Sequence, residues 1–457
     1  MEERKDRVNF ITNGDISKVI MKLSIPLMIS NLIKTLYGIT DGIFVARLSS
    51  EDYAATAFIW PLQFLFLALG IGISVASISL MSQRLGAGNK KEAKVYANHT
   101  LLISIVLGVV FAVLCYFIAP YAFKWMGAKG SFHEKSTLFL QINAIGLTFD
   151  LIFFGYQAIL NAQGMTKPIT IISAISSLTN VVLDPFFIFD NVLGLQGLGL
   201  GLRGAAYATV IAKILLVVIA VFVVKKSSEI EVSFKDFKFD SNVVRNMFSI
   251  AIPASLANSG EAIGFTILNK FIQSYGTTTL AAFSMGNRIS DIVSQASMGI
   301  GMALTSIIGQ NYGAGKEQRT KDIFKMANVM ITFLSFFAAI ILITFKDSLL
   351  SIFIKDRSEV ELWMQASEYM YYSAAITFFM GYFAAINGYF QGLGKTKLTM
   401  ILSLGRLWAF RLPVIMLLKS FTNLGSTGIW ISMLFSNAIT VFIGFDMYRK
   451  YNQAPSR

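Results

Sequence analysis

The chain is poor in the residues that most often carry enzymatic or redox chemistry. Its 457 residues include one cysteine and two histidines. Cys115 lies in an apolar run and has no second cysteine with which to form an internal disulfide. With only His99 and His133, no Ser/His/Asp or Cys/His catalytic set is credible. The sequence therefore predicts neither an enzyme nor a bound cofactor.

Charged residues are scarce as well. They make up 14% of the chain, whereas soluble proteins carry about 25%. Apolar residues make up 54%, and the mean hydropathy is +0.61. Apolar stretches of about 20 residues, long enough to cross a bilayer, recur along the whole chain. The sequence therefore predicts an all-α polytopic membrane protein. Its N-terminal segment is too polar for a secretory signal, so the first span is expected to be retained.

Twelve membrane-spanning segments can be assigned. The first six cover residues 24–46, 53–80, 97–119, 137–161, 168–189 and 204–224, and the second six cover 247–271, 279–309, 325–345, 364–390, 398–418 and 428–447. The longest polar connection, at 225–246, separates the two sets and is expected to be a cytoplasmic linker. We therefore expect an N-terminal lobe at 24–224 and a C-terminal lobe at 247–447. Cytoplasmic segments are expected at 1–23 and 448–457.

The formal net charge is +13. A basic chain can bind nucleic acid, but here most Lys and Arg residues lie on the side of the membrane that carries the N-terminus. This asymmetry follows the positive-inside rule and predicts that both termini are cytoplasmic. The basic loops are expected to contact anionic lipid headgroups of the plasma membrane rather than nucleic acid.

The two halves of the chain share an internal repeat. Several short motifs recur with one constant offset in the numbering and no gap: Ile25-Pro26 with Ile252-Pro253, Asn31 with Asn258, and GAG at 86–88 with GAG at 313–315. Farther on, GMTK at 164–167 matches GKTK at 394–397, with the offset changed by three. Because each half holds an even number of spans, both halves enter the membrane from the same face. We expect two six-helix lobes related by a pseudo-two-fold axis along the membrane normal.

A polar pair stands in the apolar fifth span. Asn180 and Asp184 are one helical turn apart, so both side chains lie on one side of a helix. Pro185 follows directly and frees a backbone carbonyl. A carboxylate, an amide oxygen and a carbonyl are the ligands that a small hard cation prefers. A charged side chain at the bilayer centre costs about 2.5–3.5 kcal/mol, which favours a functional cation site over a helix kink with a satisfied polar pair.

Five motifs together resemble one transporter family. They are DGIFVARLSSEDYAATAF from Asp41 to Phe58, the paired loops RLGAGNKKEA and NYGAGKEQRT, the segment NAQGMTKP, and LDPFFIF followed by GAAYAT. In this order on a twelve-span repeat, the chain resembles the multidrug and toxic compound extrusion (MATE) transporters over essentially its full length. The resemblance implies a two-lobed helical bundle that extrudes drugs by cation antiport.

The resemblance also implies a cation-coupling site in the N-terminal lobe. Asp41 and Asp184 match the two acids of the family, Asn180 an amide ligand, Thr209 a hydroxyl ligand and Ala205 a backbone-carbonyl ligand. Thr209 and Ala205 are four residues apart, so they share one face of span six. Two carboxylates in one low-dielectric site cannot both stay ionised without a cation, and either a proton or a sodium ion would satisfy them. Sodium is therefore a candidate bound ion, with Asp41, Asn180, Asp184 and Thr209 as its ligands. The alternative for Asp41 is a structural cap or pair.

The second half of the chain lacks these acids. Leu268 is the repeat equivalent of Asp41, and either Leu412 or Val414 is the repeat equivalent of Asp184. Coupling is therefore expected in the N-terminal lobe alone.

Two further pairs of charged residues within the spans are expected to make contacts. Lys34 and Glu261 are repeat equivalents, because the offset that relates Asn31 to Asn258 also relates these two positions. Glu261 also matches an acid used in another branch of the family, but the second acid of that branch, in span ten, has no counterpart here. We expect Lys34 and Glu261 to make an inter-lobe or substrate contact. Arg288 and Asp291, three residues apart, are expected to pair with each other.

The sequence thus predicts a secondary active multidrug exporter, acting as a monomer. It would antiport small amphipathic, mainly cationic compounds against protons or sodium ions by alternating access. A flippase for a lipid-linked saccharide is an alternative, although it would need a more cationic cavity. In a different class, an ion channel or a receptor could bury the same acids.

Overall fold

A computed structural model describes residues 2–235, 237–354 and 359–453. The helices of the first half are α1 (Glu2–Asn13), α2 (Ile16–Ala46), α3 (Ser50–Phe58), α4 (Trp60–Gly86), α5 (Lys90–Trp125), α6 (Gly130–Ala162), α7 (Thr166–Ile188) and α8 (Leu202–Ser227). Those of the second half are α9 (Ser241–Gln273), α10 (Thr277–Gly313), α11 (Glu317–Thr344), α12 (Lys346–Ser351), α13 (Val360–Gly392), α14 (Thr396–Leu404), the π-helix η1 (Gly405–Arg411), α15 (Leu412–Phe421) and α16 (Ser426–Gln453). An antiparallel hairpin of β1 (Asn191–Val192) and β2 (Leu195–Gln196) joins α7 to α8.

The predicted twelve-span, all-helical architecture is confirmed. In a bilayer core every backbone polar group must be satisfied within the chain, and a helix does this. Ten segments are long and apolar enough to cross a membrane, with α3 and α4 forming one segment and α14 to α15 another. α9 and α13 are each 33 residues long and complete the set of twelve. Most of the helices extend beyond the predicted spans.

Short helices and caps mark the places where the chain turns. α1 occupies part of the segment that was expected only to be polar, and α3 precedes α4. The Asp15 side chain accepts a hydrogen bond from the Lys18 N–H (3.0 Å) where α2 begins. Ser49 caps α3 in the same way through the Asp52 N–H (3.0 Å). Such caps satisfy N–H groups that have no partner within the helix.

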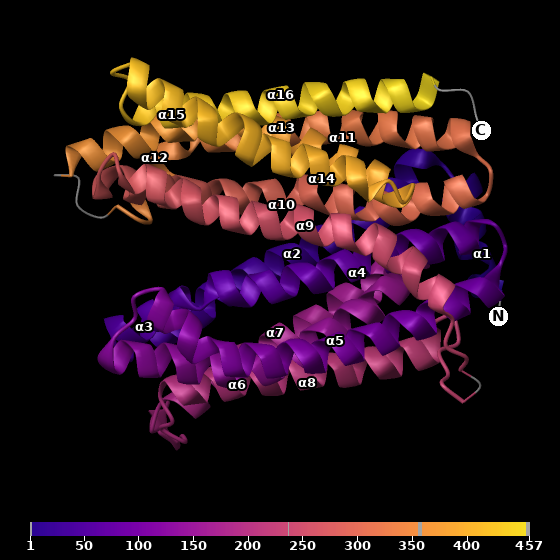
Figure 1. Cartoon of the computed structure of the whole chain (residues 1–457), viewed down its shortest axis with the longest axis horizontal. Coiled ribbons are helices and arrows are strands. Elements are labelled where there is room, and N and C mark those ends of the chain that lie inside the picture. Colours follow the sequence, from indigo (N-terminus) through magenta and orange to yellow (C-terminus); the bar gives the residue numbers. More distant parts are fainter. Residues whose placement is uncertain (1, 236, 355–358, 454–457) are drawn as a thin grey trace.

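The spans form two bundles that lie side by side (Figure 1). We call α2–α8 the first lobe and α9–α16 the second lobe. α1 and the last turns of α16 lie at one end of the molecule, here called the termini end, and α3 and α12 lie at the opposite, distal end. The arrangement fits two parallel repeats, because the first helix of each lobe starts from the termini end.

At the termini end, the first helix of each lobe packs into the core of the other lobe. Leu23 and Leu27 of α2 belong to a buried cluster with Ile300 of α10 and Ile323 of α11. α2 therefore contacts the second lobe as well as its own.

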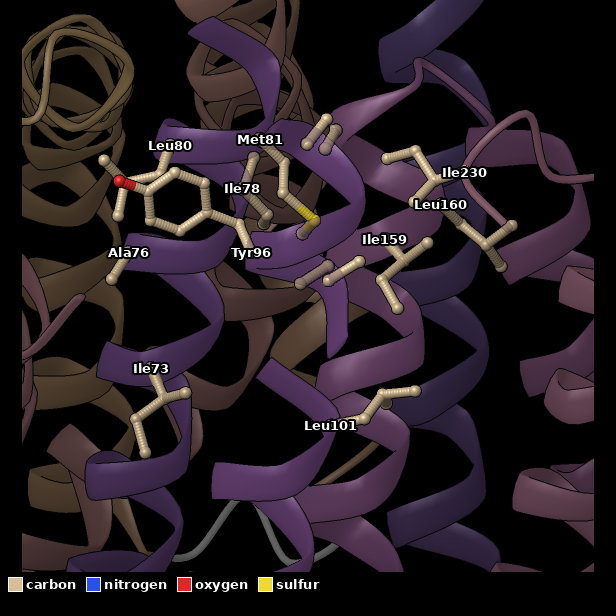
Figure 2. Close-up of a cluster of buried hydrophobic side chains, with 14 of the residues drawn as sticks. Ile73, Ala76, Ile78, Leu80, Met81, Tyr96, Leu101, Ile159, Leu160 and Ile230 are labelled. Atoms are coloured by element: carbon tan, nitrogen blue, oxygen red, sulfur yellow. The ribbon is translucent and has the colours of Figure 1, made fainter. Parts of the chain in front are cut away.

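The first helix of the second lobe makes the reciprocal contact. Met247 and Ile250 of α9 belong to the buried cluster of the first lobe. Figure 2 shows part of that cluster, including Met81 from α4, Leu101 from α5 and Ile159 from α6. Burial of this apolar surface holds the termini ends of the two lobes together.

Two glycines permit the close crossings of these helices. A Cβ atom at Gly72 would overlap Ser255 of α9, and one at Gly299 would overlap Met28 of α2. Gly72 and Gly299 are equivalent positions of the sequence repeat, as are Met28 and Ser255. The same contact thus occurs twice, once in each direction across the pseudo-two-fold axis.

The eleventh span is interrupted by the π-helix η1. π-Turns are rare, and the extra residue changes the direction in which the following side chains point. Here the π-turns carry Arg406 and Arg411, both of which are buried at 2% exposure. The irregular segment therefore places two positively charged side chains in the interior of the second lobe.

Candidate functional site

The predicted cation-site residues converge from three helices of the first lobe. Asp41 lies in the last turns of α2, Asn180 and Asp184 on α7, and Ala205 and Thr209 one turn apart on α8. The Asn180 amide donates a hydrogen bond to Thr209 Oγ1 (3.4 Å). The carboxyl groups of Asp41 and Asp184 contact each other. Asp184 and Ala205 have no exposed surface, and Asn180 is 1% exposed.

The buried oxygens of this cluster lack hydrogen-bond donors. Asp41 Oδ1, Asn180 Oδ1 and both carboxyl oxygens of Asp184 are buried without a hydrogen bond within the described part of the chain. A buried acceptor without a partner costs about 1–3 kcal/mol, and more when it is charged. The cluster is therefore short of positive charge. A proton between the two acids, or a cation among the four oxygens, would supply what is missing.

Three neighbours of the site were not assigned a role from the sequence. Tyr37, on α2, lines the same cleft as Thr209 and lies close to it. On α6 and α8, Asp150 and Lys213 form an ion pair of 2.7 Å. Lys213 also lies near enough to Asp41 to attract it electrostatically. One feature of the sequence could have placed Lys213 near the site: it lies one helical turn after Thr209 in an otherwise apolar span.

The corresponding place in the second lobe is apolar. Leu268 and Leu412 belong to one buried cluster, together with Ile415 and Trp430. Of the two positions considered for the counterpart of Asp184, Leu412 is the one found in a cluster with Leu268. Where the first lobe brings two carboxyl groups together, the second lobe thus brings two leucines together.

A cavity of about 470 Å³ lies between the two lobes. Its volume falls within the range of about 300–1,000 Å³ that is typical of small-molecule pockets. Many side-chain amides line it: Asn31, Gln157, Asn161, Asn258, Gln295, Asn387 and Gln391. Charged residues in its lining are Lys34, Glu261 and Arg406. A second, larger cleft of about 1,190 Å³ is lined by Asp41, Thr209 and Trp60 of the first lobe and by Phe265 and Arg288 of the second.

Lys34 and Glu261 both line the inter-lobe cavity, but Glu261 has a partner in its own lobe. Glu261 Oε1 accepts a hydrogen bond from Arg406 Nη2 at 2.9 Å. Arg406 also donates to Asn437 Oδ1 (3.3 Å) and lies over the Phe383 ring. No ion pair joins Lys34 to Glu261, although both belong to the described ranges. An inter-lobe contact between these two residues stays a prediction.

The expected pair of Arg288 and Asp291 is not formed, and that prediction was wrong. Asp291 instead accepts a hydrogen bond from the Asn287 amide at 3.0 Å. Arg288 lines the larger cleft. The physical reason is that Asn287, four residues before Asp291, lies on the same helix face as the acid and makes this bond, while the Arg288 side chain lies at the cleft.

The termini end of the cavity is closed by two equivalent hydrogen bonds. Gln83 Nε2 donates to the Gly392 carbonyl at 2.9 Å, from the first lobe to the second. Gln310 Nε2 donates to the Ala162 carbonyl at 2.7 Å, in the opposite direction. Gln83 and Gln310 are equivalent positions of the sequence repeat. Together with the helix crossings at Gly72 and Gly299, these bonds hold the two lobes together.

Comparisons with known proteins agree with this architecture. The model of the MatE family matches the chain twice, at residues 26–186 and 253–417, so one match falls in each lobe. The multidrug export protein MepA of Staphylococcus aureus is 24% identical over 95% of this chain and 94% of its own length. The probable multidrug resistance protein YoeA of Bacillus subtilis is 23% identical over 93% of this chain and 92% of its own.

Solved structures show the same fold. A MATE protein in complex with MaL6 superposes with a TM-score of 0.92, at 25% identity over 97% of this chain and 98% of that one. A MOP superfamily transporter from Pyrococcus furiosus, described by a reverse polarity of its binding pocket, gives a TM-score of 0.91 at 25% identity, over 97% of each chain. Together with the double family match, these likenesses lead to one conclusion: the chain belongs to the MatE family of membrane transporters.

Proposed function

We propose that the protein is a secondary active exporter of amphipathic compounds, driven by antiport of protons or sodium ions. The observation that carries this proposal is the acid pair of Asp41 and Asp184: within the described residues, Asp41 Oδ1 and both carboxyl oxygens of Asp184 are buried without a hydrogen bond, and Asp41 borders a cleft between the two lobes. The names of the relatives, which describe multidrug export and resistance, support the class of cargo.

The acid pair provides a physical basis for coupling. Two like charges about 4 Å apart at an effective dielectric constant of about 20 repel each other by about 4 kcal/mol. Asp41 and Asp184 therefore bind a proton or a cation whenever one is available, and release it only when something else compensates the charge. Asn180 and Thr209 supply neutral oxygens that suit sodium, and the Ala205 carbonyl is a further candidate ligand. Each charge that crosses the membrane adds about 2.3 kcal/mol per 100 mV.

α2 links this site to the contact between the lobes. Asp41 lies near one end of the helix, and Leu23 and Leu27, near the other, pack against the second lobe. A change of charge at Asp41 can therefore alter a contact with the second lobe through a single continuous element. We propose alternating access on this basis.

In this conformation the lobes are joined at the termini end by the hydrogen bonds of Gln83 and Gln310. If the termini are cytoplasmic, as the charge distribution favours, the distal cleft faces outward.

The inter-lobe cavity is the proposed binding site for cargo. Its amides can bond to many polar groups, and Met298, Met302 and Phe383 offer adaptable apolar contacts. Cationic cargo was expected from the sequence, and Glu261 is the one acid in the lining. We further propose that the protein resides in the plasma membrane and works as a monomer, since each chain contains both lobes.

Dye efflux from proteoliposomes tests the proposal. Purified protein is reconstituted with a fluorescent amphipathic dye inside the vesicles, and a proton or sodium gradient is then imposed. We expect efflux that needs a gradient and stops when an ionophore dissipates it. Rapid ion flux without dye movement would indicate a channel, and movement of neither would indicate a receptor. Movement of a lipid-linked saccharide without movement of dye would indicate the flippase alternative.

A further inference from the structure

We propose that the inter-lobe cavity selects amphipathic compounds that carry a carboxylate, whether anionic or zwitterionic, and that Lys34 binds this group. This inference rests on the proposed function, because it names the chemical class of the cargo. It also revises the expectation of mainly cationic cargo.

Lys34 is the charge in the cavity without a partner. Its side chain is exposed to the cavity that it lines. Within the described residues it makes no ion pair or hydrogen bond, and Asp150 attracts it only at longer range. Asp150 is itself paired with Lys213 at 2.7 Å. An ammonium group without a counter-charge in a protein-lined cavity attracts anions, so a carboxylate bound in the cavity would be stabilised by Lys34.

Glu261 does not compensate Lys34. Its Oε1 atom is held by Arg406 at 2.9 Å, and the Arg406 side chain is 2% exposed. These two charges cancel each other within the second lobe. The three charged residues of the cavity lining therefore sum to one positive charge, and that charge belongs to Lys34.

The residues that line the larger cleft also carry a net positive charge. Its lining contains Lys213 and Arg288 but only one acid, Asp41. A permanently cationic compound would meet an excess of positive charge in both the inter-lobe cavity and the larger cleft. A compound with a carboxylate would be attracted by both. The seven amides of the inner cavity can bond to a carboxylate as donors, whereas an ammonium group would use only their oxygens.

A matched pair of dyes tests the inference. Rhodamine B carries a carboxylate, and its ethyl ester has the same xanthylium core without that negative charge. Binding of each dye to purified protein in lipid nanodiscs is measured by fluorescence polarisation, without any ion gradient. We expect the wild-type protein to bind the acid at least five-fold more tightly than the ester. A wild-type protein that binds the ester equally well or better would overturn the inference.

Substitutions then test the role of Lys34. Lys34→Gln should abolish the preference for the acid, and Lys34→Arg should keep it, because the charge is retained. Lys18→Gln, in the same helix but outside the cavity, is the matched control and should keep the preference. A preference that survives Lys34→Gln would also overturn the assignment. If Lys34→Gln does not fold, the wild-type comparison still decides about the carboxylate, and Lys34→Met, which also removes the charge, replaces Lys34→Gln in the binding measurement.

The two proposals fail in different ways. Binding that favours the acid, with no gradient-driven efflux of either dye, would contradict export while leaving the carboxylate preference intact. Efflux of both dyes at equal rates, with equal binding, would support export and contradict the preference.

Discussion

At the scale of single residues, the proposed cation site can be divided between groups that any coupling ion would need and groups that only sodium would need. In this proposal Asp41 and Asp184 supply the negative charge for either ion. Asn180 and Thr209 supply neutral oxygens, and a proton has no use for these because it binds a single carboxylate. The hydrogen bond from Asn180 to Thr209 (3.4 Å) lies directly beside the acids.

Thr209→Val is expected to separate the two ions. The substitution removes the hydroxyl while keeping the shape of the side chain. Sodium-driven dye efflux should fall about ten-fold, which corresponds to a loss of about 1.4 kcal/mol, whereas proton-driven efflux should change by less than two-fold. The measurement is initial efflux from proteoliposomes under each gradient separately. Equal losses under both gradients would mean that the hydroxyl is structural.

The ion pair of Glu261 and Arg406 is expected to be a determinant of stability. Glu261→Gln leaves the Arg406 guanidinium, which is 2% exposed, without its counter-charge. Breaking a buried pair from one side costs about 3–5 kcal/mol, so the midpoint of thermal unfolding in detergent should fall clearly. Glu261→Gln combined with Arg406→Met should be more stable than Glu261→Gln alone. Additive losses would contradict a direct interaction.

How much of the site the sequence predicts depends on the residue type. Asp41 and Asp184 are conspicuous because a carboxylate in an apolar span is costly. Tyr37 is not, since aromatic residues are frequent throughout this chain. The partner of Glu261 could not be predicted either, because Arg406 is 145 residues away and its direction depends on the π-turns of η1.

At the scale of the helices, glycine controls how closely the lobes approach. Gly72 of α4 and Gly299 of α10 lie where a Cβ atom would overlap the neighbouring helix of the other lobe. The position of the spans was predictable from apolar length, because the bilayer dictates it. The packing of α2 and α9 into opposite lobes was not, because hydropathy does not say which neighbour a helix faces.

Gly72→Leu is expected to open the termini end. The new side chain cannot fit against Ser255, so the contact between α4 and α9 must separate. The thiol introduced by Asn161→Cys, in a Cys115→Ser background, should then react at least five-fold faster with a membrane-impermeant maleimide added on the termini side. Gly38→Leu is the control, because no atom lies near its Cβ position. An unchanged rate in Gly72→Leu would show that the crossing does not seal this end.

At the scale of the whole molecule, the two lobes have the same helix arrangement but different residues at the position of the acid pair. The constant offset of the repeat relates Gly72 to Gly299 and Gln83 to Gln310, and these pairs form equivalent contacts in the structure. The repeat in the sequence was therefore sufficient to predict two equivalent lobes. It also indicated the asymmetry, since Leu268 and Leu412 replace the acids in a buried apolar cluster. The shape and charge of the cavity between the lobes could not be predicted, because they arise from side chains of both halves.

The central claim is that the acid pair of the first lobe couples ion movement to export. The most direct test compares wild-type protein with Asp41→Asn and Asp184→Asn in proteoliposomes, measuring gradient-driven dye efflux and, in the same vesicles, gradient-independent dye exchange. Because Asn keeps the shape of Asp but cannot carry its charge, each substitution should reduce gradient-driven efflux at least ten-fold while dye binding and reconstitution stay normal. Full gradient-driven efflux by both single variants would contradict the claim.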